Sequence, residues 1–336
     1  MLPLTLKTEN RLVLTKGEQT MPHGFSEILV TGGAGFIGSH IVDRLLDEGF
    51  KVKVLDNLST GEKKNLAQHE NKKGFQFIEG DIRNFDAVNR AVRGVDAVVH
   101  EAALVSVTRS VEEPLLSNEI NVTGTLNLLK ASVDAHVKRF VLASSCAVYG
   151  DTETLPNHEK LAPKPLAPYA ADKLAVENYA KAFYAIYGLE TVSLRYFNVY
   201  GPRQKYGPYS GVISTFVNCL LEGKPPTIYG DGEQTRDFVN VKDVVEANML
   251  ALSKQEAAGE VFNISTGEPI TINKFTETLQ KIMGKTSLKP VHAEPRAGDI
   301  KHSYGDITKA RRNLGYAPKV PLEKGLSELV KSYSRQ

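Results

Sequence analysis

The chain contains no tryptophan and only two cysteines, Cys146 and Cys219, among its 336 residues. Two cysteines form no disulfide framework and cannot supply a zinc site by themselves, so no metal is expected and a reducing, cytoplasmic compartment is the simplest expectation. No apolar run is long enough to span a bilayer, and Lys7, Glu9 and Arg11 interrupt any signal-peptide core. We therefore expect no membrane partner.

The chain also lacks a strong excess of positive or of negative charge. The formal net charge is +2, from 41 Lys and Arg against 39 Asp and Glu. This balance argues against a nucleic-acid-binding protein, and any anionic ligand must be met by local groups. The 41% hydrophobic and 24% charged residues are typical of a globular chain with one large core or two moderate ones. Residues 1–24 are polar and aperiodic, which predicts a mobile tail.

Glycine, in contrast, is concentrated in one short stretch, residues 32–38, which reads Gly-Gly-Ala-Gly-Phe-Ile-Gly. An aliphatic run at 28–31 precedes it and an apolar-periodic segment that stops near Gly49 follows, which predicts a strand, a tight turn and a helix. Glycines there allow backbone N–H groups and the positive helix end to approach a pyrophosphate. The next predicted strand, 52–55, ends at Asp56, whose carboxylate suits the two hydroxyls of an adenosine ribose and repels a 2′-phosphate. The stretch therefore predicts a site for NAD rather than NADP.

The following segments continue the alternation of strands and helices. Asp81 follows one predicted strand and is placed to meet the adenine, and the small Ala102 and Ala103 follow another, where they let a cofactor pass close to the backbone. This alternation predicts an α/β fold with a doubly wound parallel sheet of the Rossmann type, with ligands bound beyond the carboxyl ends of the strands. The further predicted elements are strands at 75–78, 95–100 and 139–142 and a helix at 118–136.

A possible catalytic group follows the fifth strand. That strand runs into Ser144 and Ser145, and after a proline-rich loop Pro168 opens a helix that continues to Gly188. Tyr169 and Lys173 lie one turn apart on one face of this helix. A free tyrosine titrates near ~10, so a base at neutral pH needs a pKa lower by about three units, or roughly 4 kcal/mol. The Lys173 ammonium and an oxidised nicotinamide supply such positive charge, and Ser145 would hydrogen-bond the reacting hydroxyl.

At these residues the chain resembles the extended short-chain dehydrogenase/reductase family, and within it the NAD-dependent UDP-sugar 4-epimerases. The resemblance covers nearly the whole chain from about residue 27. In that family serine or threonine is more common at the position of Asp172, so this chain carries an extra negative charge next to Lys173, which we expect to face away from the site. The blocks that carry the resemblance are 31–38, 144–150, 169–173, 195–203 and 236–238.

The resemblance also implies a role for individual residues. Ser145, Tyr169 and Lys173 correspond to the catalytic set, and a UDP-sugar is the implied substrate. Among the substrate residues, Asn198, Arg236 and Arg296 correspond to diphosphate contacts, Asp299 to the uridine ribose contact and Tyr229 to the uracil contact. The full substrate set is Ser106, Ser145, Asn198, Val212, Tyr229, Arg236, Arg296, Asp299 and Ser303. The full NAD set is Gly32, Gly35, Phe36, Ile37, Gly38, Asp56, Asn57, Asp81, Ile82, Ala102, Ala103, Asn121, Tyr169, Lys173 and Tyr196.

Three kinds of activity remain open at this point. In the favoured one, Tyr169 takes the proton from the sugar O4 while C4 gives hydride to NAD, the 4-keto sugar turns over, and hydride returns to its other face. Related nucleotide-sugar dehydratases and decarboxylases need an acid just before Val-Tyr-Gly, where this chain has Cys146 and Ala147. A non-catalytic NAD-binding sensor is the third alternative, and the intact Ser145, Tyr169 and Lys173 argue against it.

The identity of the sugar depends on a gate position seven residues after Arg296. In the family this position tends to be a large tyrosine in enzymes restricted to UDP-glucose and UDP-galactose, and small where N-acetylated sugars are accepted. Here it is Ser303, which predicts that UDP-GlcNAc and UDP-GalNAc are accepted alongside or instead of the unsubstituted pair. The opposite wall, 104–106, mixes bulky and small residues and does not decide the matter.

The domain organisation follows from the same patterns. We assign residues 25–197 and 233–264 to a nucleotide-binding domain, and 198–232 and 265–336 to a smaller, loop-rich substrate lobe. The helices at 118–136 and 169–188 carry apolar residues on more than one side, and in the family such helices pair across a two-fold axis. A homodimer is therefore expected.

Overall fold

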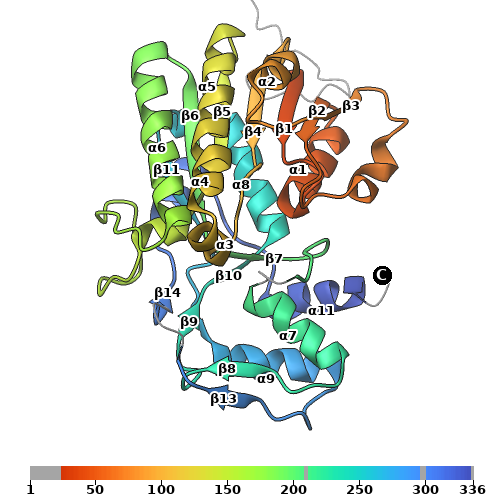
Figure 1. The fold of residues 1–336 in the computed structure, drawn as a ribbon, viewed down its shortest axis with the longest axis vertical. Helices are drawn as coiled ribbons and strands as arrows, with labels where there is room; N and C mark the ends of the chain where they lie inside the picture. Colours follow the sequence, from red (N-terminus) through yellow and green to blue (C-terminus); the bar gives the residue numbers. More distant parts are fainter. Residues whose placement is uncertain (1–23, 208–210, 296–299, 334–336) are drawn as a thin grey trace, which may run out of the picture.

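The computed structural model describes residues 24–207, 211–295 and 300–333. The predicted tail therefore lies, except for Gly24, outside the described residues. A seven-stranded parallel sheet forms the centre of the molecule, in the order β11-β6-β5-β4-β1-β2-β3 (Figure 1). Its strands are β1 (Glu27–Thr31), β2 (Lys51–Asp56), β3 (Phe75–Glu79), β4 (Ala97–His100), β5 (Arg139–Ser145), β6 (Glu190–Tyr196) and β11 (Val261–Ile264).

This sheet confirms the predicted α/β class. Strand β1 pairs with β2 on one side and with β4 on the other, so the strand order reverses between β1 and β4. In open parallel sheets, ligands bind at such a reversal, beyond the carboxyl ends of the strands. Strand β5 runs three residues beyond the predicted 139–142, so that Ser145 is its last residue.

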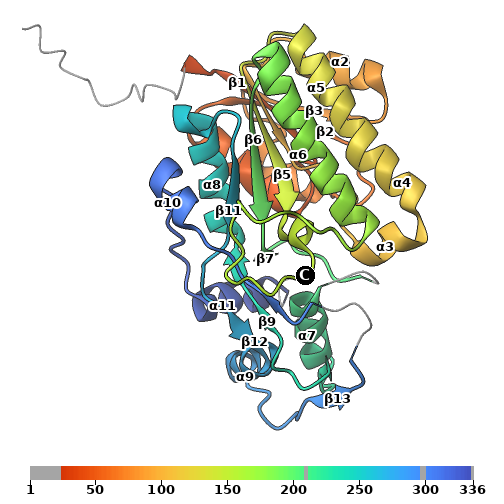
Figure 2. The same ribbon diagram turned by 90° about the vertical axis from the view of Figure 1, so that its left-hand side faces the viewer.

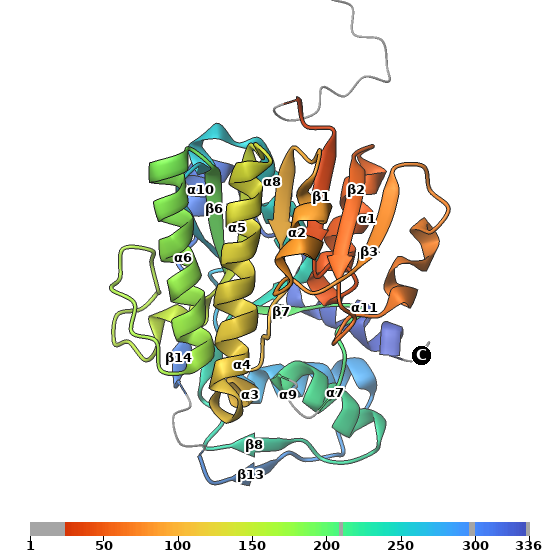
Figure 3. The ribbon, with the colours of Figure 1, turned by 45° about the horizontal axis from the view of Figure 1, so that its top comes forward.

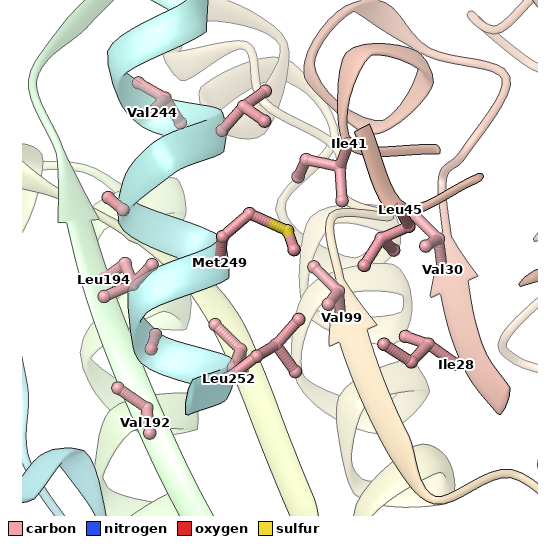
Figure 4. Close-up of a cluster of buried hydrophobic side chains, with 14 of the residues drawn as sticks. Ile28, Val30, Ile41, Leu45, Val99, Val192, Leu194, Val244, Met249 and Leu252 are labelled. Atoms are coloured by element: carbon pink, nitrogen blue, oxygen red, sulfur yellow. The ribbon is translucent and has the colours of Figure 1, made fainter. Parts of the chain in front are cut away.

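Two layers of helices cover the sheet. The helices α1 (Phe36–Asp47) and α8 (Val241–Ser253) lie on one face, and α2 (Phe85–Val92), α5 (Gly124–Asp134) and α6 (Pro168–Tyr187) lie on the other (Figure 3). On the first face Met249 of α8 lies close to Ile41 and Leu45 of α1, above Val99 of β4 (Figure 4). Burial on both faces explains why the strands are almost continuously apolar.

The turn between β1 and α1 requires glycine at two positions. Gly32 has φ +68°, and a Cβ there would lie 2.7 Å from the backbone nitrogen of Ala102. A Cβ at Gly38 would collide with the carbonyl oxygen of Gly32. The two glycines thus let the turn pack against the end of β4 and against the first turn of α1.

The helix expected at 118–136 is interrupted. The short helices α3 (Val107–Glu112) and α4 (Pro114–Asn118) lead into a π-helical turn, η3 (Glu119–Thr123), and then into α5. In contrast, α6 starts with Pro168 at its first position and ends at Gly188, which has φ +70°. Both ends of α6 therefore lie where the sequence predicted them.

A second core lies below the carboxyl edge of the sheet (Figures 1 and 2). It is built by α7 (Val212–Leu221), α9 (Ile272–Met283) and α11 (Leu322–Tyr333), with Phe216, Phe275 and Leu326 buried between them. The small strands of this region are β7 (Asn198–Tyr200), β8 (Thr227–Tyr229), β9 (Thr235–Arg236), β10 (Phe238–Asn240), β12 (Ile270–Thr271), β13 (Val291–Ala293) and β14 (His302–Ser303).

One helix departs from the predicted division into two parts. Helix α10 (Thr308–Leu314) falls in the range 265–336, yet Ala310, Leu314 and the neighbouring Tyr316 are buried in the core that covers the central sheet. The reason is that α10 packs on β11 and α8. Within the described residues, no helix is long and apolar enough to cross a membrane.

A buried ion pair fastens α6 to the sheet. Arg195 of β6 donates from Nε and Nη2 to the two carboxylate oxygens of Glu177 at 2.8 and 2.7 Å, and both side chains are nearly inaccessible. The Ser144 hydroxyl donates to the same carboxylate. Glu177 therefore connects α6 to the ends of β5 and β6.

We predict that Glu177→Gln lowers the free energy of unfolding by about 3–5 kcal/mol, because it leaves the buried Arg195 guanidinium without its counter-ion. Chemical denaturation measures the change. Glu277→Gln is the matched control, since Glu277 pairs with Lys274 and Lys281 on the surface of α9. Equal unfolding midpoints for the two variants would contradict this account of α6.

Candidate functional site

Loops that follow four neighbouring strands meet at one edge of the sheet. The glycine turn follows β1, Glu101 and Ala102 follow β4, Ser145 ends β5 and Tyr196 ends β6. The Tyr196 hydroxyl donates to the Glu101 carboxylate at 2.7 Å and accepts from the Asn248 amide at 2.7 Å. The carboxyl edge predicted to bind ligands therefore holds one connected set of polar groups.

The start of α1 fits a pyrophosphate. The N-cap residue, Gly35, has no side chain that accepts a hydrogen bond from the first turn. The first-turn N–H groups, which include those of Phe36, Ile37 and Gly38, have no acceptor within the helix. They lie at the positive end of the helix dipole, beside a turn that glycine keeps open for a close approach. The residues present thus fit the diphosphate of a dinucleotide.

The predicted adenosine residues lie at the ends of β2 and β3. Asp56 accepts hydrogen bonds from the backbone N–H of Ala34 and of Leu58, at 2.9 and 2.8 Å. Burial raises the pKa of Asp56 above its ordinary value, although both hydrogen bonds oppose the shift. Each carboxylate oxygen retains a lone pair for a ribose hydroxyl.

Asp81 lies beside this group. It accepts from the Asn57 amide at 2.9 Å and from Arg83 at 3.0 and 2.8 Å. The hydrogen bond from Arg83 is the main reason that the pKa of Asp81 falls to about 2. Asn57 and Asp81, both assigned to the cofactor from sequence, are therefore neighbours.

Two other residues assigned to the cofactor interact mainly within the protein. The Ile82 side chain is buried in the core, and its carbonyl accepts a hydrogen bond from Asn127. The Asn121 amide accepts from the Leu104 N–H at 2.8 Å and donates to the Leu104 carbonyl at 3.1 Å. Asn121 thus holds the loop that contains Ala102 and Ala103.

The three predicted catalytic residues come together. Ser145 lies close enough to the phenol of Tyr169 to oppose the rise of its pKa, and the Lys173 Nζ lies 5.8 Å from the centre of the Tyr169 ring. Lys173 Nζ also donates to the Ala143 carbonyl of β5 at 2.8 Å. The N–H of Tyr169 donates to Ser110 at 3.1 Å, which fixes the first turn of α6 on α3.

The charge states of Tyr169 and Lys173 differ from those that the sequence predicts for a general base and its neighbouring cation. Burial raises the pKa of Tyr169 to about 12, against the hydrogen bond from Ser145. Burial likewise lowers the pKa of Lys173 to about 8, against the attraction of Glu101, Asp172 and Glu177. In the chain by itself the phenol is thus protonated at neutral pH, and burial is the main cause. A further positive charge is needed before Tyr169 can serve as a base.

Cys146 stands next to Ser145, where a dehydratase would need an acid. Burial raises the pKa of its thiol to about 11, and the nearby Ser303 opposes this shift. A thiol this weakly acidic is a poor proton donor to a leaving group. Ser303, the predicted gate residue, thus lies near Cys146, which follows Ser145, the predicted catalytic serine.

The remaining substrate residues lie on the small strands and helices below this edge. Ser303 in β14 is the register partner of Arg236 in β9, and Asn198 begins β7. Tyr229 lies at the exposed end of β8, Val212 begins α7, and Ser106 caps α3. Arg296 and Asp299 lie outside the described residues, so their assignment stays a prediction.

Sequence reasoning missed two carboxylates of the site. Glu101 was not assigned any role, although a charged residue directly after a fully buried strand, at the carboxyl edge, is a usable signal. Asp172 was expected to face away, and it does point to α4, but it is 5% exposed and accepts from Ser117 Oγ at 2.6 Å and from the Asn121 amide at 3.3 Å. Nothing in the sequence indicates that partner.

Comparison with known proteins agrees with this geometry. The chain is 41% identical over 305 residues to a putative UDP-glucose 4-epimerase of Methanocaldococcus jannaschii. The matched region covers 90% of this chain and 97% of that protein. A solved UDP-N-acetylglucosamine 4-epimerase from Methanobrevibacter ruminantium M1, in complex with UDP-N-acetylmuramic acid, superposes with a TM-score of 0.88 at 40% identity, over 93% of this chain and 99% of that one. The UDP-glucose 4-epimerase of Thermotoga maritima, solved with UDP-glucose, superposes with a TM-score of 0.86 at 42% identity, over 92% of this chain and 99% of that one.

The family assignment rests on a match over most of the chain. Residues 28–265 fit the model of the NAD dependent epimerase/dehydratase family. This range includes the glycine turn, Ser145, Tyr169 and Lys173, which are the features from which the sequence predicted an NAD-dependent epimerase. The chain therefore belongs to the NAD-dependent epimerase/dehydratase family.

Proposed function

We propose that this protein inverts the configuration at C4 of a UDP-hexose through a 4-keto intermediate. The observation that carries the proposal is the contact between Ser145 and Tyr169, with Lys173 beside them, at the edge where the α1 N-terminus fits a pyrophosphate. The identity of the relatives at 40% or more supports the same activity. The dehydratase alternative is disfavoured because Cys146 and Ala147 supply no acid for elimination.

In this mechanism the residues of the chain transfer one proton and stabilise one negative charge. Tyr169 accepts the proton from the sugar O4 and later returns it, while Ser145 hydrogen-bonds the same oxygen and keeps the proton path short. Lys173 stabilises the phenolate by its positive charge. NAD, when bound, supplies the acceptor for the C4 hydride and the same hydride for its return. The residues placed to hold it are those of the β1–α1 turn, Asp56, Asn57 and the loop at Ala102.

The substrate would extend from this edge onto the small strands. In this proposal Arg236 and Asn198 would bind the diphosphate and Tyr229 the uracil, and Ser303 would be the gate residue that the sugar meets. Because the Ser303 side chain is small, it would leave more room for an acetamido group than the tyrosine common at this position in the family. We propose that UDP-GlcNAc and UDP-GalNAc are substrates, with UDP-glucose and UDP-galactose accepted as well.

Incubation with each of these four UDP-sugars, without added NAD, tests both the reaction and the sugar. We expect C4 epimers from the N-acetylated pair, detected by chromatography or NMR. Ser303→Tyr should lower kcat/KM for UDP-GlcNAc relative to UDP-glucose by about 10-fold or more, since a pocket that lacks room for a group rejects it by steric cost. Turnover of UDP-glucose but not of UDP-GlcNAc by the unaltered chain would refute the sugar assignment, and a dehydrated or decarboxylated product would refute the reaction.

Tyr169→Phe should lower kcat by about 10²–10⁴-fold, the range expected for the loss of a positioned acid–base group. NAD should remain bound, because the ring and Lys173 stay in place, and cofactor released on denaturation measures this. Tyr179→Phe, at an exposed position of the same helix, is the control and should be fully active. If Tyr169→Phe retains activity, Tyr169 is not the base.

We also propose that the protein forms a homodimer through α6, as the sequence predicts, and through α3 and α4 in place of the helix expected at 118–136, because that range holds none of the large exposed apolar side chains. These helices leave large apolar side chains exposed, namely Val107, Val111 and Leu115 on α3 and α4 and Tyr179, Ile186 and Tyr187 on α6. Large apolar side chains exposed on neighbouring helices can mark a protein–protein interface. Light scattering should give twice the mass of 36.9 kDa, and Leu115→Lys, at a side chain that is 81% exposed, should shift the mass to that of one chain. A monomeric unaltered protein at micromolar concentration would contradict the proposal.

A further inference from the structure

A buried histidine connects three elements beside the predicted cofactor site. His100 is the last residue of β4 and is 5% exposed. Its Nδ1 lies 2.7 Å from the hydroxyl of Thr31, which ends β1. Its Nε2 lies 2.9 Å from the hydroxyl of Thr125, in the first turn of α5. The ends of two central strands and the start of a covering helix therefore meet at one side chain.

The donors and acceptors around the ring fix the position of its proton. The Thr125 hydroxyl donates its single proton to the Asn121 carbonyl, so towards His100 it can only accept. Nε2 must therefore carry a proton. The other polar neighbour of the Thr31 hydroxyl in the described part of the chain is the Ala102 N–H, which is a donor, so the Thr31 proton goes to Nδ1. Burial agrees with a neutral ring, since it lowers the pKa of His100 to about 3.

The loop 101–104 leaves His100 and is fastened at both ends to one helical segment. At its far end the Leu104 backbone exchanges two hydrogen bonds with the Asn121 side chain, at 2.8 and 3.1 Å. At its near end His100 bonds Thr125, which in turn bonds the backbone carbonyl of the same Asn121. His100 thus completes a closed ring of bonds through the loop, η3 and the first turn of α5.

The same loop packs directly on the glycine turn. The Glu101 N–H donates to the Thr31 carbonyl at 3.1 Å, and a Cβ at Gly32 would lie only 2.7 Å from the Ala102 nitrogen. We propose that His100, as the neutral tautomer with its proton on Nε2, is a positioning residue that holds the loop 101–104 against the glycine turn and so helps to retain NAD. The inference concerns cofactor binding and does not depend on the reaction proposed above.

NMR tests the tautomer on the full chain as purified. Long-range ¹H–¹⁵N correlations of protein labelled with ¹⁵N-histidine distinguish a protonated ring nitrogen from an unprotonated one. The His100 signals are identified by their loss in His100→Asn and by their change in Thr125→Val. At neutral pH we expect a protonated Nε2 and an unprotonated Nδ1. A protonated Nδ1 would overturn the proposal.

The rate of NAD release tests the positioning role. His100→Asn shortens the side chain so that it no longer reaches Thr125, and Thr125→Val removes that acceptor while it keeps the side-chain shape. Each variant should release NAD from the holoprotein about 5- to 10-fold faster, as expected for the loss of one net hydrogen bond. A dehydrogenase that consumes free NAD follows the release. The double variant should release NAD no faster than the faster single variant, because both changes break the same chain of bonds.

Two further variants separate this role from a general loss of structure. Thr125→Ser restores the hydroxyl and should return the rate to that of the unaltered chain. His136→Asn is the matched control, because His136 is exposed and has φ 58°, a conformation that asparagine tolerates, and it should have no effect. Release from Thr125→Val at the unaltered rate would overturn the proposal even if His100→Asn fails to fold, and so would additive effects in the double variant. Since no sugar is added, failure of the epimerase assay would not affect this result.

Discussion

The hydrogen bond between Lys173 Nζ and the Ala143 carbonyl sets the geometry of the site. It ties α6 to β5, and β5 ends at Ser145. Because Tyr169 lies one turn before Lys173, its phenol then reaches the Ser145 hydroxyl. One turn after Lys173, Glu177 fixes the same helix to Arg195 of β6. The reacting groups are thus positioned by regular elements, which hold a side chain more precisely than a loop does.

The same burial that positions these groups also opposes their charged forms. Desolvation raises the pKa of Tyr169 to about 12 and lowers the pKa of Lys173 to about 8. Burial further raises the pKa of Glu101 to about 7. When Glu101, Asp172 and Glu177 are all ionised, they outnumber the cations Lys173 and Arg195 by one. A cation bound beside these carboxylates, such as an oxidised nicotinamide, would favour their ionised forms.

The sequence predicted those features that depend on neighbours along the chain. Glycine spacing located the β1–α1 turn, apolar runs located the first five strands, and Pro168 and Gly188 located the ends of α6. Helical spacing then placed Tyr169 and Lys173 on one face. The π-helical turn η3 was not predicted, and Asn121 within it bonds the Leu104 backbone, a tertiary contact that no helical pattern reveals. The partner of Asp172 was missed for the same reason, since a helical pattern gives the direction of a side chain but not what packs there.

The gate at Ser303 is also held by contacts that the sequence does not reveal. Its strand, β14, pairs with β9, so that Ser303 lies opposite Arg236. Next to Arg236, the fully buried Asp237 accepts hydrogen bonds from the N–H and hydroxyl of Thr266 and from the N–H groups of Gly267 and Gly305. These bonds fix the backbone on both sides of β9 and β14, so the space beside Cys146 depends on side-chain size at position 303 rather than on loop movement. If Ser303 is the proposed gate, a single side chain would therefore select between sugars without any change in the backbone that holds Ser145 and Tyr169.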